Sequence, residues 1–213
     1  MTPYYQDEYV TLYCGDCGEL LPTLGRFDLL LTDPPYGIKR FERGSLRFDK
    51  KREFPNGIKW DVAPDLETLN GIMEVVTNSI IWGMNNLPLP TTEHFLVWDK
   101  EQTVDNFASA ELAWCNLKTP AKVFRYSIHR HNNSKIGGHP TEKPLMLMTW
   151  CIALAGDNVK TIFDPFAGSG TTGVAAKLLN RKCTLIEKEE KYCEIAARRL
   201  SQGVLQLFEK EVE

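Results

Sequence analysis

The amino-acid sequence predicts an α/β protein built on a doubly wound, mostly parallel sheet of about seven strands. Short apolar runs alternate along the chain with segments of helical period, as in a parallel sheet with helices on both faces. A glycine-rich turn, AGSG, follows one apolar run and opens a helix. The 213 residues suffice for one hydrophobic core, so we expect a single domain spanning residues 1–213.

The first half of the chain supplies four of these strands. They are expected at residues 10–16, 27–36, 79–86 and 94–100. The segment CGELLPTLG predicts a short helix that Pro22 interrupts, and DLETLNGIMEVVTN has the period of a longer helix. Asn85 and Asn86, at the end of the third strand, are expected either to line a site or to have only a capping role.

The second half begins with an alternating segment and then a helix. Residues 119–130 alternate in polarity, so we expect a late or antiparallel edge strand there. Thr141 is a good N-cap and Pro144 suits a first helical turn. Together they predict a helix through LMLMTWCIALA that ends at Gly156.

Two further pairs of strand and helix complete the chain. The strands are expected at residues 161–166 and 182–187. TTGVAAKLLN has one apolar helical face and a plausible stop at Asn180. EEKYCEIAARRLSQG carries acids in its first turn and basic residues late, with Gly203 as the expected C-cap.

Charge is unevenly distributed along the chain. The net charge is only −3, but residues 39–59 carry eight Lys or Arg against three Asp or Glu, and residues 120–143 carry five against one. Two basic segments on an acidic body can form a surface for a polyanion, or they can be solvated loops. Charge alone leaves both interpretations open.

Bulk features set the expected compartment. No apolar run is long enough to span a bilayer, and the start, MTPYYQDEYV, lacks the regions of a signal peptide, so we expect a cytoplasmic protein without a membrane partner. The six cysteines are then expected to be reduced. Cys14 and Cys17 form a CxxC, which could be a redox pair, half a zinc site or two ordinary thiols. No second metal-ligand cluster accompanies it, so we expect no metal.

The segment DPFAGSGTT predicts a nucleotide-type ligand at a strand-to-helix turn. Glycines let the backbone approach a ligand, and a helix N-terminus presents free N–H groups. The spacing is not the GxGxxG of dinucleotide sites, and Glu187 ends the next strand, where an acid can hold ribose hydroxyls. The candidate cofactor residues here are Asp164, Phe166, Ala167, Gly168, Ser169, Gly170, Thr171, Thr172 and Glu187.

Three motifs carry a resemblance to a known family. DPPY at 33–36, GHPTEKP at 138–144 and DPFAGSG at 164–170 resemble the motifs of DNA amino-methyltransferases that use S-adenosylmethionine. Their order is similar to that of the circularly permuted β-class, which methylates N6 of adenine or N4 of cytosine. The resemblance implies a permuted Rossmann-like fold, S-adenosylmethionine as cofactor, double-stranded DNA as partner, and a candidate homodimer.

The permutation assigns further residues. It places the break between the helix after the second strand of the unpermuted fold and its third strand, a surface position where permutation is tolerated. Asp16, at the end of the strand 10–16, is then expected to accept a hydrogen bond from the cofactor's adenine amino group; alternatively it only forms a turn. Family members use the HPTEKP segment near the methionine part of the cofactor, which assigns Thr141, Lys143 and Pro144. Glu142 can simply favour the helix N-terminus.

The DPPY motif has a chemical reading within this family. An exocyclic amino group is a poor nucleophile, and a catalyst can help by accepting hydrogen bonds from both N–H bonds. We assign one acceptor to Asp33 and the other to the carbonyl of Pro34, held rigid by Pro34 and Pro35. Tyr36 then offers a flat face for a flipped base. DPPY leans toward adenine, which leaves N4-cytosine methylation as the alternative.

DNA contacts are expected from two segments rather than from a separate domain. Full-size relatives carry a target-recognition domain, whereas here only a short segment is available, so we expect residues 39–60 and 124–139 to be DNA-contacting loops. The assigned residues are Lys39, Arg40, Arg43, Arg47, Arg125, Arg130 and Lys135, with His131 as a further phosphate contact. By the same resemblance, Asp99 and Lys100 end a strand near the base. RNA methylation and a non-catalytic DNA- or cofactor-binding module stay open as rivals.

Overall fold

A computed structural model describes residues 2–37, 62–102, 104–105, 108–134 and 142–202. One sheet runs through this part of the chain, with nine strands in the order β1-β2-β9-β8-β3-β4-β6-β5-β7. The strands are β1 (Tyr5–Gln6), β2 (Val10–Cys14), β3 (Phe27–Thr32), β4 (Val76–Trp82), β5 (Phe95–Asp99), β6 (Ala110–Cys115), β7 (Lys122–Arg125), β8 (Thr161–Asp164) and β9 (Lys182–Glu187).

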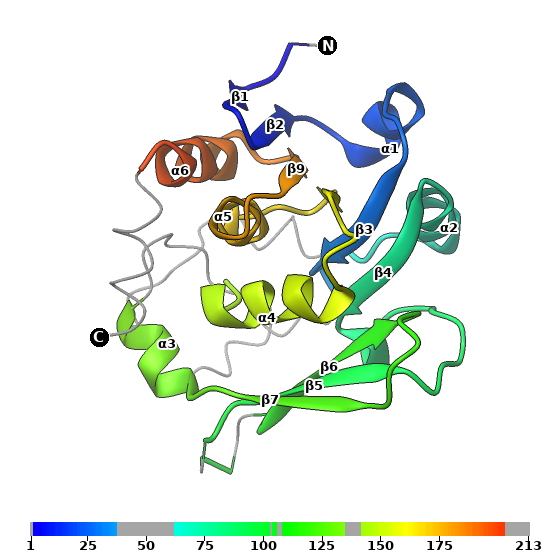
Figure 1. The fold of residues 1–213 in the computed structure, drawn as a ribbon, viewed down its shortest axis with the longest axis vertical. Coiled ribbons are helices and arrows are strands. Elements are labelled where there is room, and N and C mark those ends of the chain that lie inside the picture. Colours follow the sequence, from blue (N-terminus) through cyan, green and yellow to red (C-terminus); the bar gives the residue numbers. More distant parts are fainter. Residues whose placement is uncertain (1, 38–61, 103, 106–107, 135–141, 203–213) are drawn as a thin grey trace.

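Helices cover both faces of this sheet (Figure 1). The helical elements are α1 (Cys17–Leu20), η1 (Leu21–Thr23), α2 (Leu66–Glu74), η2 (Met84–Asn86), α3 (Ile128–Ser134), α4 (Leu145–Ala155), α5 (Thr171–Leu178) and α6 (Glu190–Leu200). Side chains of α4, α5 and α6 pack in one hydrophobic cluster with one face of the strands. Side chains of α1 and α2 pack in a second cluster on the opposite face. The predicted doubly wound fold is confirmed.

Strand β3 shows why the core strands have continuous apolar sequences. Leu29, Leu30 and Leu31 are all fully buried. Leu29 and Leu31 face the cluster with α4 and α5, whereas Leu30 faces the cluster with α1 and α2. Successive side chains point to opposite faces, so a strand covered on both sides must be apolar at every position.

The strand order confirms the permutation. Strand β8, which precedes the glycine-rich turn, lies between β9 and β3 and is parallel to both. Strand β2 is parallel to β9, although they come from opposite ends of the sequence. The DPPY strand and the glycine-turn strand are therefore neighbours, and their carboxyl ends lie at the same edge of the sheet.

The strand count and one orientation differ from the prediction. All seven expected strands are present, and β1 and β6 are additional. Strand β1 has only two residues, and β6 starts with the exposed Ala110 and the half-buried Glu111, so neither has a complete apolar signature. Strand β7 is an edge strand as expected, but it is parallel to β5 rather than antiparallel.

Helix ends mostly follow the expected signals. Gly156 ends α4 with a φ of 96°, and Asn180 follows α5 with a φ of 54°. The N-cap of α4 is Pro144, three residues after the expected N-cap Thr141, so α4 begins later than predicted and Pro144 precedes its first turn. Thr141 and Gly203 lie outside the described residues. Within the described ranges, no helix combines the length and apolar character needed to cross a bilayer.

Candidate active site

The DPPY turn and the glycine-rich turn meet at the carboxyl edge of the sheet. Thr32 ends β3 and Asp164 ends β8, and the Thr32 hydroxyl donates a 2.7 Å hydrogen bond to Oδ1 of Asp164. Asp33 follows directly on one strand, and residues 165–170 follow on the other. The juxtaposition predicted from the motif order is therefore present, with the two turns fixed to each other by a buried hydrogen bond.

The DPPY turn holds its acid and its ring together. Pro34 is buried, and neither proline offers an N–H group that could compete for an acceptor. The Tyr36 hydroxyl donates to Oδ1 of Asp33. The ring of Tyr36 lies so close to Gly83 that a Cβ built on Gly83 would be 2.0 Å from Cε1 of the ring. Gly83 also has a φ of 82°, so this position favours glycine for two reasons: the positive φ and the closely packed ring.

Lys143 connects the HPTEKP segment to the DPPY turn. Its Nζ lies 2.5 Å from Oδ2 of Asp33 and 3.0 Å from Oε2 of Glu111 in β6, and its side chain is 6% exposed. Nζ of Lys100 lies 2.5 Å from Oε1 of the same Glu111. The family resemblance assigns Lys143 to the cofactor; the structure places its ammonium between two carboxylates, one of them in the DPPY turn.

Burial and charge set the ionisation of this cluster. Burial raises the pKa of Asp33, even though Lys143 and the Tyr36 hydroxyl favour its charged form. Burial acts in the same direction on Glu111, but the ammonium groups of Lys143 and Lys100 outweigh it and lower the pKa of Glu111 to about 2. Burial acts to lower the pKa of Lys143, but Asp33 and Glu111 raise it well above its usual value. Lys143 and Glu111 therefore stay charged.

The glycine-rich turn is shaped to approach a ligand. Gly168 and Gly170 have φ values of 54° and 79°, in the left-handed region that favours glycine. Glu187, the last residue of β9, accepts hydrogen bonds of 2.8 Å from the N–H groups of Gly168 and Glu189. Burial raises the pKa of Glu187, although these two donors act against it. A carboxylate at the end of β9 beside a glycine turn fits a ligand with ribose hydroxyls.

A buried ion pair between Arg199 and Glu142 supports the glycine-rich turn. Nη1 of Arg199 in α6 donates to the Ser169 hydroxyl at 3.0 Å and to the Thr171 hydroxyl at 2.9 Å. The same nitrogen lies 2.9 Å from Oε1 of Glu142, and both charged side chains are almost completely buried. The Glu142 carboxylate therefore pairs with Arg199 and holds the described residues 142–144 near the turn.

The remaining residues of the turn lie where the motif places them. Asp164 is buried and accepts hydrogen bonds from the Thr32 and Thr172 hydroxyls and from the Phe166 N–H group. Burial raises its pKa to about 6 despite these donors. Ala167 is buried, and its N–H group donates to the carbonyl of Ile186 in β9.

Asp16 lies at the same edge, one strand further along. Its Oδ1 accepts from the N–H group of Gly18 at 2.9 Å and so caps α1, and its Oδ2 lies 2.9 Å from Nζ of Lys188. The hydrogen bond from Gly18 is the one expected if Asp16 only forms a turn. The N–H group of the neighbouring Gly15 donates to the carbonyl of Glu187, which keeps Asp16 close to Glu187 and the glycine-rich turn. Its role toward an adenine ring stays a prediction.

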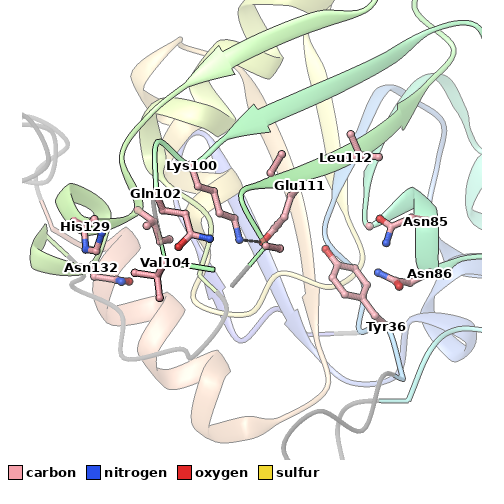
Figure 2. A pocket seen from close by; sticks show the side chains of 14 residues that line it. Tyr36, Asn85, Asn86, Lys100, Gln102, Val104, Glu111, Leu112, His129 and Asn132 are labelled. Carbon is pink, nitrogen blue, oxygen red and sulfur yellow. Dashed lines mark hydrogen bonds and ion pairs between the residues drawn. The ribbon is translucent and has the colours of Figure 1, made fainter. Parts of the chain in front are cut away.

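A pocket of about 410 Å³ opens in front of Tyr36 (Figure 2). Asn85 and Asn86 lie beside the Tyr36 ring, and His129 and Asn132 of α3 form the facing side. Lys100 and Glu111 lie between these two walls. Tyr36 of the DPPY turn therefore lines the pocket, and so do the asparagines that follow β4.

The predicted DNA-contacting residues fall into two groups. Lys39, Arg40, Arg43, Arg47 and Lys135 lie outside the described residues, as does the whole segment 39–60. Arg125 is 68% exposed, with Nε 3.5 Å from Oδ2 of Asp99, and the Arg130 guanidinium lies 5.8 Å from the centre of the Tyr126 ring.

Two expectations for this region are wrong. The segment 124–139 is not simply a loop, because it contains the end of β7 and helix α3. His131 is buried, and its Nε2 lies 2.7 Å from the carbonyl of Glu142, so it packs inside the protein and cannot contact a phosphate. Its neighbours in sequence are basic or polar, which is why it was mistaken for a surface residue.

Sequence reasoning missed Gly83, Glu111 and Arg199. Gly83 lay unremarked within the expected strand 79–86, and the strand that carries Glu111 was not predicted. Arg199 lies in a helix turn with Arg198, and α6 shows burial for Arg199 but exposure for Arg198. Helical phase could have separated the two, because Arg199 shares its face with Cys193, Ala196 and Leu200.

Comparisons with known proteins show which family the chain resembles. The sequence profile of a DNA methylase family covering N6 and N4 enzymes matches residues 76–198. The chain is 46% identical to the type II methyltransferase M2.MboI of Moraxella bovis over 250 residues, which cover 92% of this chain and 90% of that protein. It is 26% identical to M2.LlaDCHI of Lactococcus lactis, over 94% and 93%.

Solved structures share the fold. The complex of M1.HpyAVI with S-adenosylmethionine matches with a TM-score of 0.58 at 22% identity, covering 91% of this chain and all of that one. The cytosine-N4-specific PvuII DNA methyltransferase matches with a TM-score of 0.63 at 16% identity, covering 99% and 94%. The chain therefore belongs to the DNA methylase family, whose members are S-adenosylmethionine-dependent enzymes that methylate amino groups of DNA bases.

Proposed function

We propose that this protein transfers a methyl group from S-adenosylmethionine to the exocyclic N6 of an adenine that is flipped out of double-stranded DNA. One observation carries the proposal: Tyr36, whose hydroxyl donates to the Asp33 carboxylate, lines a pocket, and the DPPY turn follows β3, the strand that pairs with the β8 strand before the glycine-rich turn. A methyl donor on that turn and a base in that pocket would meet at Asp33.

The residues of the glycine-rich turn fit this cofactor. The Glu187 carboxylate would accept hydrogen bonds from the ribose hydroxyls, in place of its present bond from the Gly168 N–H group. Asp16 would receive the adenine amino group, since it lies one strand beyond Glu187. Bound there, S-adenosylmethionine supplies an electrophilic methyl group.

Asp33 supports the reaction by accepting a hydrogen bond from the amino group and by stabilising the positive charge that develops there. As the amino nitrogen gains a carbon it becomes cationic, and a nearby carboxylate stabilises the charge as it develops. Burial raises the pKa of Asp33, which makes this carboxylate a better acceptor for the proton that the nitrogen must lose. The Pro34 carbonyl is the second acceptor in this scheme, held by the restricted φ of the proline.

The pocket suits a flipped base. Its volume lies within the range of small-ligand sites, and Tyr36 offers a flat surface at one wall. The amides of Asn85 and Asn86 can donate to or accept from ring nitrogens. Cytosine N4 is the second candidate, since a cytosine-specific enzyme shares the fold, but the aspartate of DPPY favours adenine within the family.

The test is to identify the methylated base. Purified protein is incubated with labelled S-adenosylmethionine and unmethylated plasmid DNA, the DNA is digested, and the nucleosides are separated. We expect label in N6-methyldeoxyadenosine. Label in N4-methyldeoxycytidine would support the second candidate, and label only in RNA or protein would contradict the proposal.

A further inference from the structure

The Asp33 carboxylate already has two partners. Its Oδ1 accepts from the Tyr36 hydroxyl, and its Oδ2 lies 2.5 Å from the ammonium of Lys143. An amino group that donates to Asp33 must therefore share or replace one of these contacts. A carboxylate paired with an ammonium also stabilises a developing cation less, because the ammonium repels that cation.

Lys143 has a second carboxylate within reach. Its Nζ is 3.0 Å from Oε2 of Glu111, so a small movement would carry it from one carboxylate to the other. Glu111 stays ionised because it lies between two ammonium groups, those of Lys143 and Lys100. It comes from β6, outside the three sequence motifs, and it also lines the pocket in front of Tyr36.

We propose that Glu111 is a positioning residue that draws the Lys143 ammonium away from Asp33 when the target amino group arrives. Oδ2 of Asp33 then accepts the N–H bond of the base, while Lys143 stays paired with Glu111 and the cluster keeps its charge balance. No covalent bond changes in this step. The inference rests on the proposed methyl transfer and adds a residue to it.

The proposal differs from a purely structural role in one consequence. Without the Glu111 charge, Lys143 would have Asp33 as its only carboxylate in this cluster, and Asp33 would remain neutralised. The Glu111→Gln variant keeps the shape of the side chain and removes only its charge. It should slow the chemical step at saturating substrates, while the affinities for cofactor and DNA change little.

The test is a double-mutant cycle on the single-turnover rate of methyl transfer, with saturating cofactor and excess enzyme. We expect Glu111→Gln to lower this rate by about 10-fold or more. Adding Lys143→Gln should then raise the rate above that of Glu111→Gln alone, because the ammonium that pairs with Asp33 is removed. Glu67→Gln, an exposed substitution at the start of α2, is the matched control.

Each outcome decides the proposal. A rate for Glu111→Gln within about 2-fold of the wild type would overturn it. A double variant that is as slow as Glu111→Gln, or inactive, would overturn it as well, because Lys143 would then be required rather than inhibitory. Thermal unfolding of each variant shows that the protein is folded in the assay. If the wild type methylates no DNA, the proposed function fails; if it does and the cycle shows no recovery, only this inference fails.

Discussion

The hydroxyl of Thr32 donates a 2.7 Å hydrogen bond to Oδ1 of Asp164, across the boundary between β3 and β8. Both residues are buried, and each is the last residue of its strand. The turn that follows one strand carries Asp33, the proposed catalytic acid, and the turn that follows the other carries the glycines. Together with the pairing of β3 and β8, this contact holds the proposed base site beside the proposed cofactor site.

Asp164 makes stability depend on pH. Burial raises its pKa from 3.8 in a free side chain to about 6. The folded state thus holds the proton more tightly than the unfolded state, so this stabilising contribution is full below pH about 4 and is lost as the pH rises through about 6. We expect the free energy of unfolding of Asp164→Asn, measured in urea, to gain about 2 kcal/mol relative to the wild type between pH 4 and pH 7.

Asp28 provides a control of opposite sign. Its carboxylate accepts from the N–H groups of Lys160 and Thr161 at the start of β8, and these bonds lower its pKa. Its stabilising contribution is therefore present above its unfolded pKa and lost as the pH falls. Asp28→Asn should lose stability relative to the wild type at neutral pH and recover it in acid. A pH-independent difference for Asp164→Asn would contradict the assignment.

Asp33→Ala should separate catalysis from cofactor binding. The side chain contacts Tyr36 and Lys143 but not the glycine-rich turn, so its loss removes the acceptor for the amino group. We expect the rate of methyl transfer to fall by about 1,000-fold. The dissociation constant of S-adenosylmethionine, measured by calorimetry, should change little. A collapse of cofactor affinity would show that the roles are wrongly divided.

Gly83→Ala should displace the Tyr36 ring. A Cβ at Gly83 would meet the ring at 2.0 Å, so the ring must move and the base surface moves with it. We expect catalytic efficiency to fall by about 100-fold, the scale of a misplaced reacting group. Steady-state kinetics with an oligonucleotide duplex measures this loss.

Gly156→Ala is the control for backbone strain. Gly156 also has a positive φ, 96°, but no atom lies within 4 Å of the position that its Cβ would take. Both substitutions should cost about 1 kcal/mol or more of unfolding free energy, since alanine disfavours these backbone angles. Only Gly83→Ala should impair methylation, and equal impairment would point to strain instead of ring displacement.

Glu187→Gln should weaken the binding of S-adenosylmethionine. A carboxylate accepts ribose hydroxyl hydrogen bonds more strongly than an amide, and hydrogen bonds to charged groups are the stronger kind. We expect the dissociation constant of S-adenosylmethionine to rise by about 10- to 100-fold. Glu190→Gln, an exposed change in the first turn of α6, should leave it unaltered. Unchanged affinity in Glu187→Gln would remove the ribose assignment.

Arg125→Gln should weaken DNA binding without changing sequence preference. The side chain is exposed beside the pocket strands, and its Nε lies 3.5 Å from Oδ2 of Asp99. A lost phosphate contact should reduce the slope of log affinity against log salt by about 1. Lys191→Gln on α6 is the control, and an unchanged slope for Arg125→Gln would exclude that contact.

The sequence predicted the parts of the site that depend on local signals. Gly168 and Gly170 adopt the left-handed angles that their motif requires, and Glu187 ends its strand where the apolar pattern placed it. The neighbouring positions of β3 and β8 followed from the order of the motifs. In each case a short stretch of residues carried enough information by itself.

The rest of the site depends on register between distant segments. Glu111 reaches Lys143 only because β6 is inserted antiparallel between β4 and β5, with Ala113 opposite Trp82. That register is fixed by packing across the sheet, which a single strand pattern does not specify. His131 was likewise misassigned, because its burial comes from a contact with the Glu142 carbonyl in another segment.

The order of strands also affects how the chain folds during synthesis. Strands β2 and β3 are synthesised early, but they do not pair with each other, because β9 and β8 lie between them. Leu29 of β3 can pair with Ile162 of β8 only after β8 has been synthesised. Each early strand therefore has one unpaired edge while most of the chain is made. Open edges of this kind favour association with other nascent chains, and the sheet closes only when its last two strands arrive.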